Sequence, residues 1–526
     1  MTLTSSHLDS LIRLLAAQEG FSPAQVETRE THISWVILTA DNAYKIKKPV
    51  NPGFLDFSTL SQRKYFCYEE YRLNRRFAEK LYTGVVTLCG ADGTPVDYAV
   101  KMQRFDHRQC FDELLAAGRL QAMHLLDLAT QLATWIDKLP GAALTSPYGS
   151  PRAIYAPVRE TLDALKHAVP ADQADTLTNL DHWCENEYQQ HKQDFLQRKE
   201  TRHVIECHGD LHLGNIVWLD HHAVPFDCIE FDPNLRWIDI INEIAFTLMD
   251  LARGGKQAFS NLLLGKYLEY SNDYAGLAVL RFYLVYRALV RAKIQMLRSR
   301  QAELDAVRRQ QCLSSCSAYI ALAKTFTVPR HPCLLITHGL SGSGKSTVTD
   351  KLSQHTGMLY LRSDVLRKKL YPGSIPEQES SQLNTGLYSQ HMTDKVYRTM
   401  LHTAEFMLKQ GYSVIVDASF LNRQYRDWFF DLARRQEVRF TILHLAADSS
   451  TLARRVETRQ ADPANVSDAD KSVLAYQLKQ YSGLEQREKD YTLEIDTTGP
   501  VDARQLAARL KLPGDTGNPD GATFLS

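Results

Sequence analysis

The chain has 526 residues, too many for one hydrophobic core, so we expect at least two domains. Lys plus Arg and Asp plus Glu both number 61, so no global attraction to nucleic acid or to a membrane follows from charge. No apolar run approaches the roughly 18 residues of a membrane span, and the start of the chain lacks the features of a signal peptide. The nine cysteines show no zinc spacing. We therefore expect a cytoplasmic, reduced protein without membrane association.

The first part of the chain predicts a helix followed by a sheet. Residues 7–18 are amphipathic, and residues 30–50 read as two strands joined by a polar turn. In the second strand Lys45 and Lys47 alternate with apolar neighbours, so both point to one face. An edge strand guarded by lysines is an equally good explanation of this stretch alone.

Residues 60–80 predict a helix with Glu69 and Glu70 in its first half. A lysine on a strand and a glutamate on the next helix can form the ion pair that positions the phosphates of a nucleotide. Residues 96–106 then read as a strand that ends in a polar segment. In a two-lobed kinase this would be the hinge that binds adenine, and Met102 is its candidate cofactor-binding residue. Taken alone, the segment is only a strand end.

The decisive stretch in this half is residues 204–232. An apolar strand ends in the letters HGDLHLGN, and a second strand ends near Asp227. Asp210 is placed to accept a proton from an attacking hydroxyl, whereas Asn215 and Asp227 offer oxygen ligands to one metal ion. A base with two oxygen ligands for Mg²⁺ is the working set of kinase chemistry.

This motif resembles the aminoglycoside phosphotransferase family, a branch of the protein-kinase-like fold. The resemblance implies a small N-terminal lobe around a sheet and a larger helical lobe. It implies that Asp210 is the catalytic base and that Asn215 and Asp227 bind Mg²⁺. It also implies that His208 and Asp239 are structural, holding the catalytic loop and the following helix.

The resemblance covers residues 30–300 and leaves two choices open in the small lobe. The phosphate-binding lysine of the family corresponds to Lys45 or Lys47, with Lys45 preferred. Its acidic partner is Glu70 or Glu69, with Glu70 preferred. Residues 325–332 contain two prolines and no helical period, so we place a domain boundary there and expect domains of 1–325 and 326–526.

The strongest motif of the chain follows this boundary. A short apolar strand leads into GLSGSGKS at residues 339–346, which fits G-x-x-x-x-G-K-[S/T], and a helix follows. The glycines let backbone N–H groups surround a phosphate chain at a helix N-terminus. Lys345 can reach the terminal phosphates, and the Ser346 hydroxyl can hold Mg²⁺. The candidate nucleotide-binding residues are Gly339, Ser341, Gly342, Ser343, Gly344, Lys345, Ser346 and Thr347.

Two acidic residues at strand ends extend this site. A predicted strand ends at Ser363 and Asp364, at the mouth of the sheet, where a carboxylate can activate an acceptor hydroxyl. Arg367, one turn later, can clamp an anionic group of the acceptor. An N-cap aspartate with an exposed arginine is the alternative explanation. Asp417 ends the buried strand at residues 413–417, the position where a carboxylate holds Mg²⁺ through water.

A predicted helix farther along the chain carries arginines that could reach the same nucleotide site. Arg454, Arg455 and Arg459 lie on a predicted helix that leads into a polar loop at residues 460–468. In phosphoryl transfer a lid presents such arginines to the developing charge, and Arg459 is the candidate because it lies nearest the loop. A solvated basic helix is the alternative.

Strands alternate with helices after residue 326, which predicts a parallel sheet with helices on both faces. The motifs together resemble P-loop small-molecule and polynucleotide kinases, and residues 417–426 are similar to the kinase domain of polynucleotide 5′-kinases. That resemblance implies that Asp364 is the general base and that Arg367 binds acceptor phosphate. The expected fold class is thus α+β for the bilobal N-terminal domain and α/β for the C-terminal domain.

We hypothesise a fusion of two ATP-dependent, Mg²⁺-dependent phosphotransferases that each act on a hydroxyl. In a second interpretation only the C-terminal half is catalytic, and the kinase-like half recognises a substrate or regulates. In a third the chain is a nucleotide-gated switch with slow hydrolysis. The acceptor stays open between a small molecule and a 5′-hydroxyl nucleic acid, since family names do not fix substrates.

Overall fold

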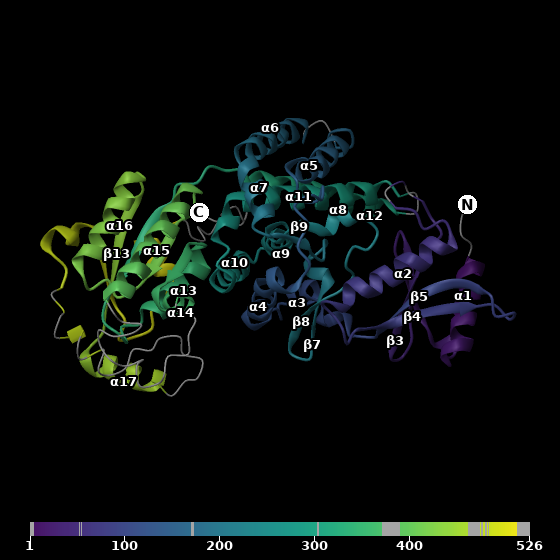
Figure 1. The fold of residues 1–526 in the computed structure, drawn as a ribbon, viewed down its shortest axis with the longest axis horizontal. Coiled ribbons are helices and arrows are strands. Elements are labelled where there is room, and N and C mark those ends of the chain that lie inside the picture. The colour runs from purple at the N-terminus through teal and green to yellow at the C-terminus, as the bar shows by residue number, and fades with distance from the viewer. Residues whose placement is uncertain are drawn as a thin grey trace. The chain divides into compact units, whose positions relative to one another are not determined.

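The structure is a computed structural model. It describes residues 5–51, 53, 55–169, 173–301, 304–370, 390–460, 474, 477–478, 481 and 483–512. The chain divides into two compact units, one of Met1–Ala164 and Glu185–Asp250 and one of Leu165–Cys184 and Leu251–Ser526. The first unit is organised around an antiparallel sheet and the second around a parallel sheet (Figure 1). The domain boundary at 325/326 rests on motifs and composition and stays a prediction.

The first unit begins with a small lobe whose sheet has the order β1-β2-β3-β5-β4. Every neighbouring pair in it is antiparallel. The strands are β1 Glu27–Glu30, β2 Ser34–Leu38, β3 Asn42–Lys47, β4 Tyr82–Cys89 and β5 Pro95–Gln103. Strands β2 and β3 are the two that the sequence predicts within residues 30–50, and β1 adds an exposed edge beside them.

Two helices cover opposite faces of this sheet, and Figure 1 shows β4 and β5 between them. They are α1 Ser5–Glu19 and α2 Leu60–Arg75. Strand alternation sends Tyr44 and Ile46 of β3 into the apolar cluster under α1. It sends Lys45 and Lys47 to the face that α2 covers. Because β3 pairs with β2 and β5, the alternative of an edge strand guarded by lysines is wrong.

After β5 the chain forms a larger, mostly helical lobe with two short strand pairs, β6 with β9 and β7 with β8. The elements are α3 Phe111–Ala116, α4 Ala122–Lys138, α5 Pro151–Lys166, α7 Lys192–Glu200, β6 Val204–Glu206, β7 Ile216–Leu219, β8 His222–Pro225, α8 Pro233–Arg236, β9 Trp237–Asp239 and α9 Ile240–Arg253. Helix α6 Ala174–Gln190 lies between α5 and α7 in the sequence, but its residues up to Cys184 belong to the second unit. The small sheet lobe and the helical lobe match the predicted bilobal architecture.

The second unit contains the parallel sheet, in the order β11-β12-β10-β13-β14. Three helices precede it: α10 Gln257–Ser271, α11 Leu277–Ser299 and α12 Ala306–Phe326. The remaining elements are β10 Cys333–His338, α13 Lys345–Thr356, β11 Leu359–Arg362, α14 Ser363–Leu370, α15 Gln390–Lys409, β12 Val414–Asp417, α16 Arg423–Arg435, β13 Arg439–Ala446, α17 Ser449–Gln460, β14 Thr492–Asp496 and α19 Ala503–Arg509.

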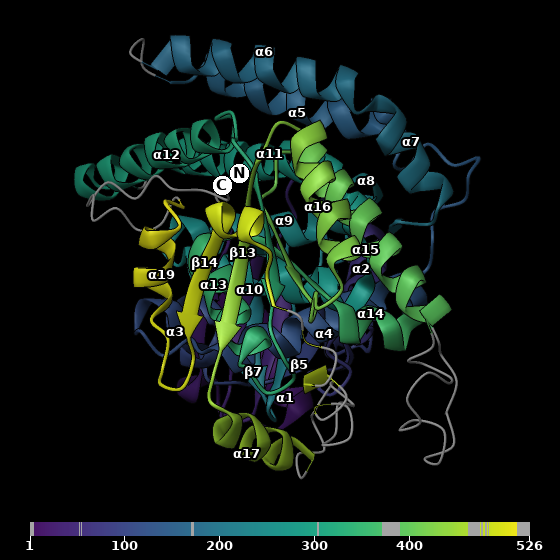
Figure 2. The same ribbon diagram turned by 90° about the vertical axis from the view of Figure 1, so that its left-hand side faces the viewer.

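Helices lie on both faces of the parallel sheet, as Figure 2 shows around β13 and β14. On one face α13 and α19 join a core with the apolar residues of β10, β12 and β13, for example Leu352 against Leu335 and Leu443. On the other face α15 and α16 pack against β10, β12 and β13. The predicted α/β fold of this part is confirmed. Across the residues that the structure describes, no helix combines the length and apolarity needed to cross a bilayer.

Candidate functional sites

In the first unit β3, α2 and the segment after β8 bring three predicted residues together. Lys45 donates to Glu70 Oε1 at 2.9 Å and also contacts Asp227. Burial alone would lower the pKa of Lys45, but the carboxylates of Asp227 and Glu70 outweigh it and raise this pKa well above its usual value. Lys45 is therefore positively charged at pH 7, and it contacts the carboxylate of Asp227, which is predicted to bind metal.

Lys47 occupies a second, sealed position on the same strand. Its Nζ donates to Glu70 Oε2 at 2.7 Å and contacts Glu230, and its side chain is wholly buried. Glu70 therefore bridges two lysines, of which Lys45 also contacts Asp227 and Lys47 is wholly buried. Of the two choices that the sequence leaves open, Lys45 is the lysine placed beside Asp227. Their functional roles stay predictions.

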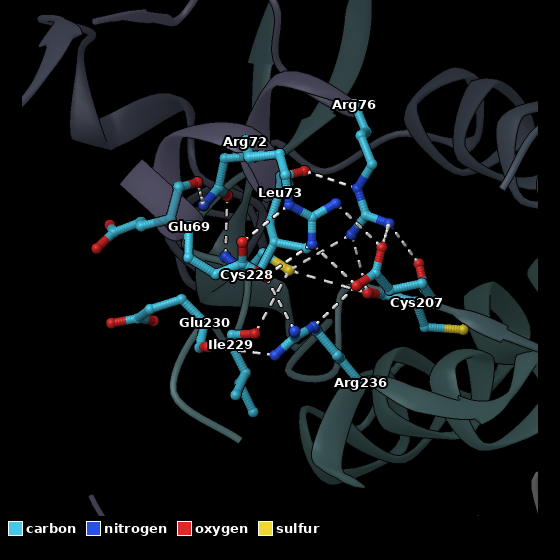
Figure 3. Close-up of polar contacts among 12 residues, drawn as sticks. Glu69, Arg72, Leu73, Arg76, Cys207, Cys228, Ile229, Glu230 and Arg236 are labelled. Carbon is cyan, nitrogen blue, oxygen red and sulfur yellow. Dashed lines mark hydrogen bonds and ion pairs between the residues drawn. The ribbon is translucent and has the colours of Figure 1, made fainter. Parts of the chain in front are cut away.

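Glu69 points away from the lysines, into a cluster that Figure 3 shows between α2 and the segment after Asp227. In this cluster Glu206, the last residue of β6, accepts hydrogen bonds from Arg72, Arg76 and Arg236. These arginines lower the pKa of Glu206 although burial opposes the change. The cluster ties α2, which carries Glu70, to the strand that leads into the HGDLHLGN loop.

The HGDLHLGN loop places Asp210 beside Asn215. The Asn215 amide nitrogen donates to the Asp210 carbonyl at 3.0 Å and to its carboxylate at 3.2 Å. This arrangement leaves the Asn215 side-chain oxygen for a cation. The sequence analysis missed His212, whose Nδ1 accepts from the Gly214 N–H and whose Nε2 lies 3.6 Å from the Asp210 carboxylate. Because Nδ1 accepts a hydrogen bond, the ring carries its hydrogen on Nε2, which faces the candidate base.

Helix α9 fixes this loop at three points, a feature the sequence analysis also missed. Glu243 accepts from the Gly209 N–H at 2.9 Å, and Thr247 donates to the Leu211 carbonyl at 2.6 Å. Asp250 accepts from the N–H of Leu213 at 3.1 Å. Their spacing of four and three residues puts Glu243, Thr247 and Asp250 on one helix face, which is the signal that would have found them.

His208 and Asp239, which are expected to be structural, are buried, and both form hydrogen bonds. His208 Nε2 donates to the Phe226 carbonyl at 2.8 Å, and burial lowers the pKa of His208 to about 4, so its ring is neutral at pH 7. Asp239 receives two bonds from Arg198, at 2.5 and 2.8 Å. Asp227, next to Phe226, has a φ of +65°, a conformation that residues with side chains rarely adopt and that clusters at functional sites.

Met102, the predicted hinge residue, is buried in the small-lobe core, opposite Ala43 of β3 and Tyr82 of β4. It lies one residue before β5 ends. Beyond it the N–H of Arg104 donates to the Asp41 carbonyl at 2.8 Å. The role of Met102 in binding adenine stays a prediction.

In the second unit the GLSGSGKS loop has the backbone conformation that its glycines permit. Gly342 has a φ of +83°, and a Cβ there would lie 2.8 Å from the Leu452 carbonyl oxygen. Lys345 donates to the carbonyls of Gly339 and Leu340 at 3.0 and 2.9 Å. Helix α13 begins at Lys345, so its N-terminal amides and partial positive charge face the loop.

The predicted metal ligands of this site touch each other. Ser346 donates to Asp417 Oδ2 at 2.7 Å, and Thr337 lies 3.4 Å from the other carboxylate oxygen. Burial raises the pKa of Asp417 above its usual value, although Lys345 opposes the change. A hydroxyl and a carboxylate are the hard oxygen donors that Mg²⁺ prefers, so these side chains fit the ion.

Asp364 and Arg367 lie on α14, which directly follows β11. In the sheet β11 is the neighbour of β12, the strand that ends at Asp417. Asp364 is half-buried in the first turn of α14, and its charge acts on Asp417. Arg367 is buried and donates to the Thr393 hydroxyl of α15 at 3.4 Å. The alternative of an exposed arginine is therefore wrong for Arg367. Acceptor binding by either residue stays a prediction.

The arginine helix is α17, and it lies beside the phosphate loop. Arg455 donates to the Gly342 carbonyl at 3.4 Å and to the Thr497 carbonyl at 2.6 Å. With Arg454 it lines a cavity of about 480 Å³ between the start of α13 and residues 497–501. Arg459 lies in the last turn of α17, and its side chain falls outside the described part of the chain, as does the predicted lid loop.

Residues 334–484 match the family model of an AAA domain. The match contains the GLSGSGKS loop and the acidic residues Asp364 and Asp417. This part of the chain is an AAA-type P-loop domain, as its motifs predict.

A mycobacterial relative extends over both parts of the chain. "Uncharacterized protein Rv2004c" of Mycobacterium tuberculosis (strain ATCC 25618 / H37Rv) is 29% identical over 482 residues, which cover 90% of this chain and 93% of that protein. Both parts of the chain thus have counterparts in one protein.

Two solved structures are each similar to a smaller part of the chain than the mycobacterial relative is. A choline/ethanolamine kinase family protein from Mesorhizobium loti is 12% identical, with a TM-score of 0.36, over 60% of this chain and 99% of that chain. A sugar kinase from Janibacter sp. HTCC2649 is 22% identical, with a TM-score of 0.27, over 37% of this chain and 99% of that chain.

Proposed function

We propose that the protein is a bifunctional ATP-dependent phosphotransferase with one site in each compact unit. The observation that carries the proposal is that each unit gathers its own set of a lysine, two oxygen ligands and a candidate base. Such a set serves the positioning and charge neutralisation on which phosphoryl transfer depends. A switch that only hydrolyses nucleotide has no need of an acceptor-side base and clamp.

In the N-terminal site Lys45, held by Glu70, orients the phosphates of ATP. Asn215 and Asp227 would hold Mg²⁺, which when bound would supply positive charge beside those phosphates. Asp210 accepts the proton of the acceptor hydroxyl as the hydroxyl oxygen bonds to the γ-phosphorus, the bond from that phosphorus to the β,γ-bridging oxygen breaks, and ADP leaves. The His212 N–H keeps the Asp210 carboxylate oriented toward the acceptor.

In the C-terminal site the backbone amides of the GLSGSGKS loop and Lys345 hold the phosphates, and Ser346 and Asp417 would hold Mg²⁺. The cavity lined by Arg454 and Arg455 has both polar and apolar residues in its lining, and its volume of about 480 Å³ suits the nucleoside part of ATP. Asp364 accepts the proton of the second acceptor hydroxyl, and Arg367 binds an anionic group of that acceptor.

Label transfer from γ-labelled ATP tests the proposal. The acceptor panel contains aminoglycosides, sugars, nucleosides and 5′-hydroxyl oligonucleotides, and the proteins are the unmodified chain, Lys345→Ala and Asp210→Asn. We expect one labelled product to disappear in each variant. Transfer that Asp210→Asn leaves unchanged would restrict catalysis to the P-loop half. Release of free phosphate without any labelled acceptor would favour the nucleotide-gated switch.

A further inference from the structure

Helix α10 precedes the predicted domain boundary, yet it packs in the same compact unit as the phosphate loop, against α13 and β11. Asn261 donates to the Gln354 carbonyl of α13 at 3.1 Å. Lys266 pairs with Asp350, also on α13, at 3.5 Å. Helix α13, which follows the phosphate loop, thus contacts α10 through Asp350 and Gln354.

Near its C-terminal end, α10 also holds both ends of α14. The Glu269 carboxylate, which is buried, pairs with Arg362 at 3.3 Å, and Arg362 directly precedes α14. Lys369, in the last turn of α14, donates to the backbone carbonyls of Glu269 and Tyr270. These carbonyls lie in the last turn of α10, where a cation is favourable.

The geometry of α14 separates its anchored face from its functional face. Leu366 and Lys369 are three residues apart on α14 and share one face, which Lys369 places toward α10, and Arg362 contacts α10 from the end of β11 just before the helix begins. Asp364 and Arg367 fall on the other side of the helix. Arg362 also acts electrostatically on both Asp364 and Asp417. Fixing the α10 face therefore fixes the direction in which the acceptor-side residues point.

We propose that Glu269 is a positioning residue of the C-terminal site, through which α10 sets α14 and its residues Asp364 and Arg367 against the phosphate loop. The proposal deepens the function given above and rests on it. It means that the acceptor side of the P-loop site is built in part by a helix from the segment before residue 326.

The test uses the full chain and two variants: Glu269→Gln, which removes the ion pair with Arg362 together with the pair that Glu269 forms with Lys266 within α10, and Lys369→Met, which removes the contact with the end of α10 and leaves Lys266 unchanged. Glu405→Gln, which breaks a partly exposed pair with Lys409 on α15, is the matched control. Backbone hydrogen exchange is followed in residues 363–370. Affinity for a non-hydrolysable ATP analogue and label transfer by the C-terminal site are measured alongside.

We expect both variants, but not the control, to speed exchange in α14 about fivefold to tenfold, as loss of one partly buried charge contact does. Transfer should fall about tenfold while affinity for the analogue stays within about twofold, because no phosphate contact changes. Unchanged exchange in both variants would overturn the proposal, as would a loss of analogue affinity that matches the loss of transfer. If the unmodified chain transfers no label, the proposed function fails, and exchange still decides the anchoring.

Discussion

Replacing Lys47 by Met separates stability from catalysis in the small lobe. The carboxylates of Glu70, Asp227 and Glu230 form ion pairs with two lysines there, and Glu230 pairs with Lys47. The Lys47 side chain is 0% exposed, and those of Glu70 and Glu230 are 0% and 4% exposed. Breaking a buried pair by removing one partner leaves an uncompensated charge, so Lys47→Met should cost about 3–5 kcal/mol of unfolding free energy.

The assay is urea unfolding of the full chain followed by tryptophan fluorescence, with Lys45→Met as the matched variant two residues away. With m of about 2–3 kcal/mol per M, Lys47→Met should lower the first midpoint by more than about 1 M. Lys45 is slightly exposed and pairs with the half-exposed Asp227, so Lys45→Met should shift the midpoint less and should abolish transfer by the N-terminal site. A midpoint unchanged in Lys47→Met, or equal shifts in the two variants, would refute this reasoning.

Three further outcomes follow from the structure. The pKa of His208 is about 4 in the folded protein against 6.5 for the free side chain, so the unfolded chain binds more protons between these values. Stability should therefore fall as pH drops through this window, by on the order of 3 kcal/mol for this group, and His208→Gln should flatten the curve of urea midpoint against pH. Glu206→Gln should destabilise the first unit by about 3 kcal/mol in urea unfolding, because three arginines lose their shared carboxylate, whereas the exposed Glu79→Gln should change nothing measurable. Arg455→Ala should raise the KM for ATP of the C-terminal site about tenfold and leave the N-terminal site unchanged, as steady-state kinetics would record.

The sequence predicts best where local motif and element order coincide. The contact of Ser346 with Asp417 follows from a strand-loop-helix motif and from a second buried strand, because the C-terminal ends of parallel strands meet at one sheet edge. The shared face of Lys45 and Lys47 likewise follows from strand alternation alone. Both expectations need no knowledge of distant packing.

The sequence could not choose between neighbouring residues whose directions depend on tertiary packing. Glu69 and Glu70 are consecutive on α2, about 100° apart around the helix, and only the docking of α2 turns Glu70 to the lysines. The role of Arg367 as an acceptor clamp stays a prediction, and its burial against α15, which begins at residue 390, depends on packing that the sequence around α14 does not indicate. The anchoring of α14 by Glu269 crosses the predicted boundary, so no motif of either half indicates it.

Equilibrium titration with a non-hydrolysable ATP analogue and Mg²⁺ counts the nucleotide sites of the chain. We expect two molecules bound per chain, one of which is lost in Lys45→Met and the other in Lys345→Ala, with none bound by the double variant. A single molecule bound per chain, lost in Lys345→Ala and unaffected by Lys45→Met, would show that the N-terminal half holds no nucleotide site.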